Sequence, residues 1–571
     1  MTSPSDVDGD TASTQLAALA QAALDIAMGA EPLAASLYGI PGYDDQLGDL
    51  SAESEAATVT AMTSVAQRSA VLDRSALSDQ ERVTAAVLVA LGQSAADSQT
   101  AALATYTASD LMISPAPGLF SVLPIVPIAG EGQAEAYLAR LAAVPAYLEQ
   151  AAQRLAEGRA MGREGVARLV RAAIRQLDSY AEGVAEGVDP LARDAPSELA
   201  DEADWVSRRD RLLAQAVHPA LAATRDDLAG SVLPGARDDD HAGLAHLGDG
   251  SALYAACVRL HTTTDADPAD LHAIGLGVLD DLDARFARLG RSLYGEDDPV
   301  VVRRRLREDP SLAYASADQI LADAAEAVAR AEAALPGYFG HLPQGRCAVE
   351  PVPSLEAPGA PPAYYRPPAL DGSRAGTYFA NTFEPHNRRR PMAQAVAFHE
   401  AVPGHHLQIA IAMESEGLPM VRRLGGFTAY VEGWGLYAET LAEEMGLYTD
   451  DAALLGLAAT IAWRAGRLVV DTGLHAMGWT RDQAVQLMAT RTGVAALEVG
   501  TEVDRYIAWP GQALAYMVGR LEFQRLRAQA SESLGEAFSL SAFHDVVLGA
   551  GSLPLRVLAD RVTEWTAAQL A

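Results

Sequence analysis

Apolar residues recur every three or four positions along most of this chain, which is the period of an amphipathic helix. Such patterns cover about residues 17–111, 133–183, 198–228, 252–335 and 391 to the end. Ala and Leu dominate these blocks while runs of β-branched residues are short, so intrinsic propensity also favours helix. The pattern therefore predicts a mainly α fold.

The pattern changes after Pro336. Residues 347–383 are rich in Pro, Tyr and Val, and the stretch from Gly376 to Phe383 is the best strand candidate in the chain. We therefore expect one short sheet at about 347–383. In the helical blocks, Asp267-Pro268 and Asp309-Pro310-Ser311 are typical helix starts.

Length and composition suggest how these elements are grouped. A chain of 571 residues with 49% hydrophobic and 21% charged residues can bury a large core. The acidic first residues, 1–15, are predicted to form a disordered tail. We expect residues 16–335 to form a helical lobe on one side of a cleft, and residues 336–571 to form the lobe that carries the chemistry.

Charge and cysteine content narrow the possible partners and location. The formal charge is -32, from 75 acidic and 43 basic residues, and every basic side chain is Arg. This acidity disfavours nucleic acid as a partner, and solubility explains it without a steering role. Two cysteines, Cys257 and Cys347, cannot form a disulfide framework. With no secretory signal at the amino terminus and no sufficiently long apolar run, we expect a cytoplasmic protein without a membrane span.

The candidate chemistry is centred on the segment from Phe398 to Gln408. His399 and Glu400 are followed by His405 and His406, between two apolar runs, so the cluster is expected to be buried. Imidazoles and a carboxylate on one segment suit a catalytic zinc, because Glu can deprotonate a metal-bound water. The alternative is a polar surface turn.

The spacing in this segment departs from the usual one, in which the second His follows the first by four residues. Here that position is Pro403, so a regular helix would place the next His roughly 9 to 10.5 Å further along its axis. Pro403-Gly404 allows the helix to bulge and to bring the later turn back. His405 is the favoured second ligand because it needs the smaller bulge, and His406 is the alternative, otherwise a substrate-binding or catalytic donor.

A third ligand is expected on a following helix. Glu432 lies 27 residues after His405 and is followed by Trp434, which two glycines, Gly433 and Gly435, flank. Glu439 lies two turns later on the same face and is expected to orient a histidine from outside the coordination sphere. The alternative is that both are solvated helix carboxylates.

Two further segments carry polar residues among apolar ones. Arg467, Asp471 and His475 form a stripe at four-residue spacing that could brace the site or form an ordinary buried ion pair. Gln512 and Tyr516 lie one turn apart; the tyrosine hydroxyl suits stabilisation of an oxyanion, and core packing is its alternative role.

Together these motifs resemble a bacterial family known only as a domain of unknown function and grouped with the gluzincin metallopeptidases, the thermolysin-like clan. The resemblance rests on His399 to Gln408, on the Glu432-Gly-Trp helix, and on the segments that contain Asp471 and Tyr516. It extends upstream to about residue 40. It implies a two-lobed helical metallopeptidase body with a small β element beside the metal helix, although the stretched histidine spacing departs from the usual clan pattern.

In such enzymes an edge strand beside the metal helix pairs with the extended substrate, and Tyr378 and Asn381 stand in the matching place. Gln512 is a further expected substrate contact. Arg388, with its two arginine neighbours, could bind a substrate carboxylate, although a solvated basic turn is the favoured interpretation.

The resulting hypothesis is a zinc peptidase of small peptides. One Zn²⁺ is held by His399, His405 and Glu432, and Glu400 moves the proton of the attacking water while Tyr516 stabilises the oxyanion. The alternatives are an inactive peptide-binding scaffold and a zinc hydrolase of other amides or esters. The sequence makes no prediction of oligomeric state.

Overall fold

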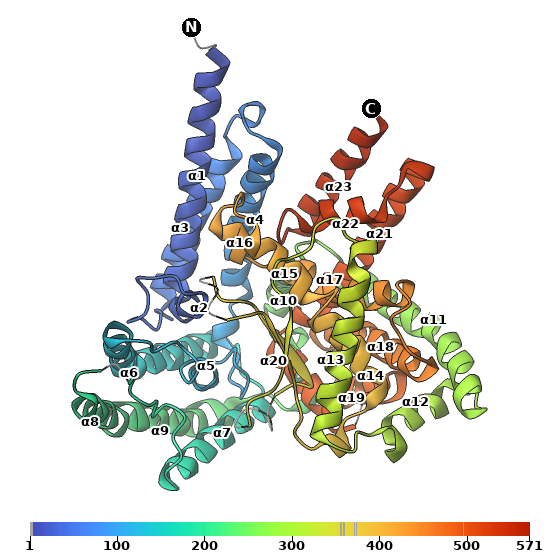
Figure 1. The fold of residues 1–571 in the computed structure, drawn as a ribbon. Helices are drawn as coiled ribbons and strands as arrows, with labels where there is room; N and C mark the ends of the chain where they lie inside the picture. The colour runs from blue at the N-terminus through green and yellow to red at the C-terminus, as the bar shows by residue number, and fades with distance from the viewer. Residues whose placement is uncertain are drawn as a thin grey trace.

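The structure is a computed structural model that describes residues 4–571 apart from 198, 355–356, 358–359, 371, 373 and 495. Helices dominate these residues, and the described strands form one three-stranded sheet (Figure 1). The prediction of a mainly α fold with a small β element is confirmed.

Nine α-helices build the first part of the described chain. They are α1 (Pro4–Ala30), α2 (Pro32–Tyr38), α3 (Ala52–Ala70), α4 (Asp79–Ala101), α5 (Pro115–Val122), α6 (Glu131–Ala160), α7 (Ala167–Ala185), α8 (Glu202–Leu212) and α9 (His218–Asp227). Single π-helical turns flank α9 at Leu213–Val217 and Leu228–Val232. The first helix begins inside the segment that the sequence predicted to be a disordered tail.

The remaining helices surround the sheet and the candidate site. They are α10 (Gly250–Thr262), α11 (Pro268–Tyr294), α12 (Pro299–Glu308), α13 (Ala317–Ala334), α14 (Arg390–Glu400), α15 (His405–Glu414), α16 (Met420–Leu424), α17 (Thr428–Glu444), α18 (Asp451–His475), α19 (Arg481–Arg491), α20 (Ala496–Ala508), α21 (Ala515–Leu534), α22 (Leu540–Leu548) and α23 (Leu555–Leu570). A 3₁₀ turn, η11 (Gln512–Leu514), precedes α21.

The predicted helix starts behave differently from each other. Asp267 caps α11, because its carboxylate accepts a hydrogen bond from the backbone N–H of Ala269. Asp309 caps only a 3₁₀ turn at Pro310–Leu312. The next long helix, α13, begins at Ala317 with Ser316 as its cap.

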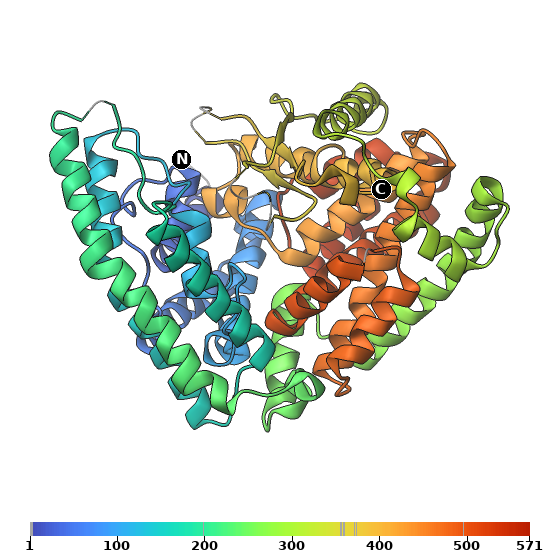
Figure 2. The ribbon, with the colours of Figure 1, turned by 90° about the horizontal axis from the view of Figure 1, so that it is seen from below.

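Two bodies of helices lie side by side (Figures 1 and 2). Helices α5 to α9 share one apolar core, whereas α10 to α13 bury their apolar faces together with α14, α17, α18 and α21. On α11, a Cβ at Gly275 would lie 2.8 Å from a methyl of Val469, so the bare glycine lets α11 approach α18 closely. Packing therefore groups residues 250–335 with the metal-site helices, which differs from the predicted boundary at 335.

The sheet lies within the predicted range, with β1 (Ala348–Pro351), β2 (Ala363–Arg366) and β3 (Thr377–Ala380). Its order is β1-β3-β2, with β1 parallel and β2 antiparallel to β3. The strand proposed to pair with substrate, β3, is thus central and hydrogen-bonded on both sides. It has no free edge for a peptide, so that expectation is wrong.

One described helix, α18, is long and apolar enough by length and composition to cross a membrane. The bent pair Ala12–Ala30 and Pro32–Tyr38 passes the same test only when it is taken as one span. Within α18, 94% of the apolar window is buried inside the protein. This burial is typical of the central helix of a folded core.

Candidate metal centre

The candidate centre begins where the expected bulged helix is instead broken in two. Helix α14 ends at Glu400 and α15 begins at His405. A Cβ at Gly404 would lie 1.9 Å from the carbonyl oxygen of His399, so only glycine allows the chain to turn back this closely. The indole N–H of Trp434 donates to the carbonyl of Pro403 at 2.9 Å and holds the break in place.

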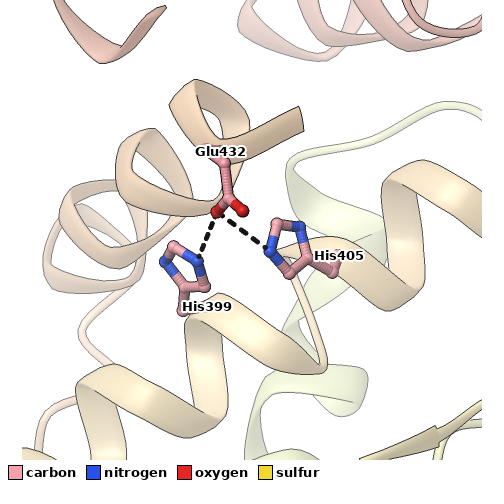
Figure 3. Close-up of side chains that lie close together, drawn as sticks. All are labelled: His399, His405 and Glu432. Atoms are coloured by element: carbon pink, nitrogen blue, oxygen red, sulfur yellow. Dashed lines mark ion pairs between the residues drawn. The ribbon is translucent and has the colours of Figure 1, made fainter. Parts of the chain in front are cut away.

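The break brings His399 and His405 together from opposite sides of the turn, and Glu432 on α17 faces both (Figure 3). Glu432 Oε2 lies 3.4 Å from His399 Nε2 and 3.5 Å from His405 Nε2. One ligand atom of each residue lies within 4.8 Å of the others. The two imidazole rings are 4.7 Å apart and nearly perpendicular.

These distances fit a tetrahedral zinc. Ligand atoms about 2.0–2.2 Å from the metal are separated from one another by about 3.3–3.6 Å at the tetrahedral angle. The two His–Glu separations fall in this range without any movement of the side chains. Two imidazoles and one carboxylate are also the donor set of a catalytic zinc that keeps a position for water.

The electrostatics of the three residues also favour a cation among them. Burial lowers the pKa of His399, but Glu432 and Glu439 outweigh burial and raise it to about 10. Burial raises the pKa of Glu432, but the facing imidazoles outweigh burial and hold it well below its usual value. A proton or a metal ion can supply this positive charge, and the spacing suits the metal.

Glu439 lies behind His399, as the two-turn spacing suggested. Its fully buried carboxylate accepts from His399 Nδ1 at 2.9 Å and from the hydroxyl of Thr460 at 2.6 Å. Arg464 lies 3.6 Å from the same carboxylate. Because Nδ1 carries the proton in this bond, His399 presents Nε2 to Glu432 and to the metal position.

Two glycines of α17 make this approach possible. A Cβ at Gly435 would lie 2.7 Å from the ring of His399, and a Cβ at Gly433 would lie 2.4 Å from the Cα of Gly519 on α21. The glycines that flank Trp434 therefore let α17 contact the metal histidine on one side and a neighbouring helix on the other.

Glu400 is the last residue of α14 and is adjacent in sequence to a ligand. Its side chain is partly exposed and forms no hydrogen bond to any described residue. Burial raises its pKa, and His399 and His405 counteract that rise. A carboxylate that is free of partners and close to the ligands can accept the proton of a metal-bound water.

Tyr516 at the start of α21 stacks beside His399, with ring centroids 6.3 Å apart. Arg467 Cζ lies 4.4 Å from the centroid of the tyrosine ring. Arg505 Nη2 lies 3.5 Å from the Tyr516 hydroxyl and donates to Gln512 Oε1 at 2.6 Å. Tyr516 is thus a direct neighbour of the centre. Gln512 is linked to Tyr516 through Arg505, which the sequence analysis did not select.

Asp471 and His475 brace this region from a distance. Asp471 accepts from the Tyr254 hydroxyl at 2.6 Å and from the backbone N–H of Gly511 at 3.1 Å, which positions the turn before Tyr516. His475 accepts from the backbone N–H of Leu244 and donates to the carbonyl of Tyr506. Neither residue contacts a metal ligand.

His406 is not available as a metal ligand or as an oxyanion donor. Its Nδ1 accepts from the Tyr365 hydroxyl at 3.0 Å, and its Nε2 donates to the carbonyl of Gly345 at 3.0 Å. Both ring nitrogens are therefore occupied by the protein. His406 instead ties α15 to β2 and to the segment before β1.

The structure also differs from the predicted substrate contacts at three positions. Tyr378 is buried on the central strand. Asn381 is fully buried and its amide donates to three loop carbonyls, one of them Ala357 O at 2.8 Å. Arg388 donates to the carbonyl of Phe383 at 2.9 Å. Asn381 and Arg388 hold their own loops because backbone carbonyls that only the fold brings near take up their donors.

Two residues near the centre were missed by sequence reasoning, Tyr365 and Arg505. Tyr365 meets His406 only because the fold brings β2 and α15 together, and no spacing in the sequence relates them. Arg505 lies seven residues before Gln512, and nothing local marks it.

Comparison with known proteins places the chain among proteins without an established activity. Residues 32–562 match the family described as "Bacterial protein of unknown function (DUF885)". A crystal structure of a "putative lipoprotein" from Colwellia psychrerythraea superposes with a TM-score of 0.89 at 27% identity, covering 98% of this chain and 100% of that chain. A "putative lipoprotein of unknown function" from Shewanella oneidensis gives a TM-score of 0.73 at 18% identity, covering 95% and 99%. No curated protein matches.

Proposed function

This chain belongs to the bacterial DUF885 family of unknown function, and from the chemistry of its metal centre we propose that it is a zinc-dependent hydrolase that cleaves short peptides. The observation that carries the proposal is the ligand set of His399, His405 and Glu432 at zinc spacing, with the unpartnered Glu400 beside it. The set matches the donor chemistry of gluzincin peptidases, the group that the sequence motifs resemble.

Each residue around the centre has a defined task in this proposal. A zinc ion bound here would supply a Lewis acid that polarises a water and the scissile carbonyl. Glu400 accepts the proton of the attacking water and delivers it to the leaving amine nitrogen as the C–N bond breaks. Tyr516 donates a hydrogen bond to the oxyanion that forms on the carbonyl oxygen.

Short peptides rather than folded proteins are the proposed substrates, because the candidate ligands are largely covered by protein. The side chains of His399, His405 and Glu432 are 3%, 10% and 20% exposed. A folded domain presents too broad a surface to reach side chains covered to this degree, whereas a short extended peptide does not.

The proposal is tested by metal analysis and hydrolysis on the same preparations. We expect the purified protein to hold about one zinc per chain and to cut quenched-fluorescent peptides. Glu400→Gln should keep the zinc and lose activity by about 10²–10⁴-fold, because it removes the base alone. Glu432→Ala should lose zinc and activity together. Glu443→Gln, on the same helix but paired with Arg285, is the matched control.

Other outcomes point to the alternative functions. Zinc binding with no hydrolysis of peptides, esters or amides would contradict the peptidase and favour a peptide-binding scaffold. Hydrolysis of esters or small amides alone would favour a different zinc hydrolase. A protein that binds no zinc would remove the basis of the proposal.

The cytoplasmic location expected from the acidic amino terminus stays a prediction, and the similar structures fit it poorly because both are described as lipoproteins. A lipoprotein is anchored at a membrane surface, and a peptidase there would meet imported or secreted peptides. Fractionation of cells with an antibody to this protein decides between the two locations.

A further inference from the structure

Two arginines beside Tyr516 share a single carboxylate. Arg467 on α18 lies 2.9 Å from Glu502, and Arg505 on α20 lies 3.5 Å from the other oxygen of Glu502. Among the described residues no second carboxylate forms an ion pair with either guanidinium. The arginine pair, Arg467 and Arg505, therefore carries one positive charge in excess.

The arginine pair lies one tyrosine side chain away from the metal centre. Arg467 lies over the ring of Tyr516, which stacks beside the ligand His399. Arg505 reaches the hydroxyl end of the same tyrosine and the side chain of Gln512. Both arginines are thus held in fixed positions relative to the ligands.

No second carboxylate among the described residues neutralises this excess charge, although Arg467 also lies against the rings of Trp463 and Tyr506 and donates to the Tyr506 hydroxyl at 3.0 Å. Arg467 is only 4% exposed, and its Nη1 is buried without a hydrogen-bond partner. Arg505 is 23% exposed, and Glu432 at the candidate metal position is 20% exposed. A largely buried charge without an opposite charge beside it is unfavourable, so an anionic group that reaches Arg505 is stabilised here. The planar guanidinium of Arg505 suits a carboxylate in particular.

We propose that Arg505, supported by Arg467 and Gln512, binds the free carboxylate at the carboxyl end of a short peptide substrate. This inference rests on the proposed function and names its substrate class. An extended peptide covers about 7 Å in two residues, which is comparable to the length of the tyrosine that separates Arg505 from the ligands. The enzyme then removes roughly two residues from the carboxyl end of peptides. This role replaces the one that the sequence suggested for Arg388.

The experiment compares one peptide in three forms: a free acid, its carboxyl-terminal amide, and an amide with Asp as the last residue. Calorimetry measures their binding to the zinc-loaded Glu400→Gln protein, and the wild-type enzyme gives kcat/KM for each. We expect the free acid to bind about 10- to 100-fold more tightly than the amide, the range of a charge-assisted contact. Tighter binding of the Asp amide than of the free acid would assign the site to an acidic side chain and overturn the proposal.

Variants separate a binding role from a structural one. Arg505→Gln should bring the acid-to-amide ratio close to one, because the acid loses much more affinity than the amide. Arg505→Lys should give an intermediate ratio, because lysine keeps the charge but lacks the planar pair of donors. Arg525→Gln, at an exposed pair with Glu522 on α21, is the control and should keep the wild-type ratio.

Each remaining outcome decides the question. Equal binding of acid and amide by the zinc-loaded Glu400→Gln protein, or an equal loss for both peptides in Arg505→Gln, would overturn the subsite. If Arg505→Gln does not fold, the ratio measured for Arg505→Lys decides. Selective binding of the acid without cleavage by the wild type would support the subsite and contradict the peptidase, so the two failures are distinguishable.

Discussion

At the scale of single residues, the carboxylate of Glu439 decides which nitrogen of His399 faces the metal position. It accepts the Nδ1 proton at 2.9 Å and is itself held by Thr460 and Arg464. A histidine whose other nitrogen is held in this way keeps its tautomer and its ring orientation.

Glu439→Gln should therefore weaken zinc binding by about 10–100-fold, because the amide keeps the shape but loses the charge behind the imidazole. Competition against a chromophoric zinc chelator measures the affinity. Glu443→Gln on the same helix is the control. Unchanged affinity in Glu439→Gln would show that this contact does not support the metal.

Asp471 is a second residue whose charge state is set by the fold. Burial raises its pKa to about 7, against the lowering effect of Tyr254 and of the Gly511 N–H. The folded protein then binds more protons here than the unfolded chain between about pH 4 and pH 7, so this group lowers stability as pH rises through that window.

Asp471→Asn should remove this loss of stability with rising pH. The stability of the variant relative to wild type should rise by roughly 1–3 kcal/mol from near pH 5 to near pH 8, measured by urea unfolding at both pH values. Asn at the exposed position Asp281 is the control and should show no such change. A pH-independent difference for Asp471→Asn would contradict the raised pKa.

At the scale of elements, close approach between helices positions the centre. The break between α14 and α15 depends on Gly404, and α17 reaches His399 through Gly435. In the same way, α11 contacts α18 at Gly275, where a Cβ would lie 2.8 Å from Val469 and 3.0 Å from the carbonyl of Ala465.

A matched pair on α11 tests this packing. Gly275→Ala should lower the free energy of unfolding by roughly 1–3 kcal/mol, because the added methyl overpacks the contact. Gly277→Ala, where a Cβ meets nothing within 4 Å, should raise it by roughly 0.5–1 kcal/mol through helix propensity. Denaturant unfolding measures both free energies. If the two variants change the free energy of unfolding in the same direction, the close α11–α18 contact is contradicted.

At the scale of the whole molecule, the three candidate metal ligands come from three separate helices, α14, α15 and α17. A metal that binds the folded state but not the unfolded chain stabilises the fold by about 2.7 kcal/mol at a free concentration 100 times Kd. We therefore propose that metal binding at these three residues is coupled to folding.

Removal of zinc with a chelator should lower Tm, and added zinc should restore it, because the ligands converge only in the folded chain. Scanning calorimetry measures the shift with and without zinc. Glu432→Ala should show no shift on addition of zinc. A wild-type protein whose Tm does not change when zinc is removed or added would contradict a zinc site that is formed by the fold.

Local spacing was sufficient to predict the mainly helical fold, the position of the sheet, and the candidates His399, His405 and Glu432, whose side chains the structure brings together. It was sufficient because helical period and the identity of metal-binding side chains are properties of short segments. The sequence favoured His405 over His406 for its smaller bulge, and the structure positions His405 through a break between α14 and α15 instead of a bulge.

Only the packed fold decided the partners that come from elsewhere in the chain. The central place of β3 in the sheet, the tie from His406 to Tyr365, and the closeness of Arg505 to Tyr516 all join segments far apart in sequence or unrelated by helical period. A local pattern carries no information on such pairings, because burial and hydrogen bonding between distant elements select them.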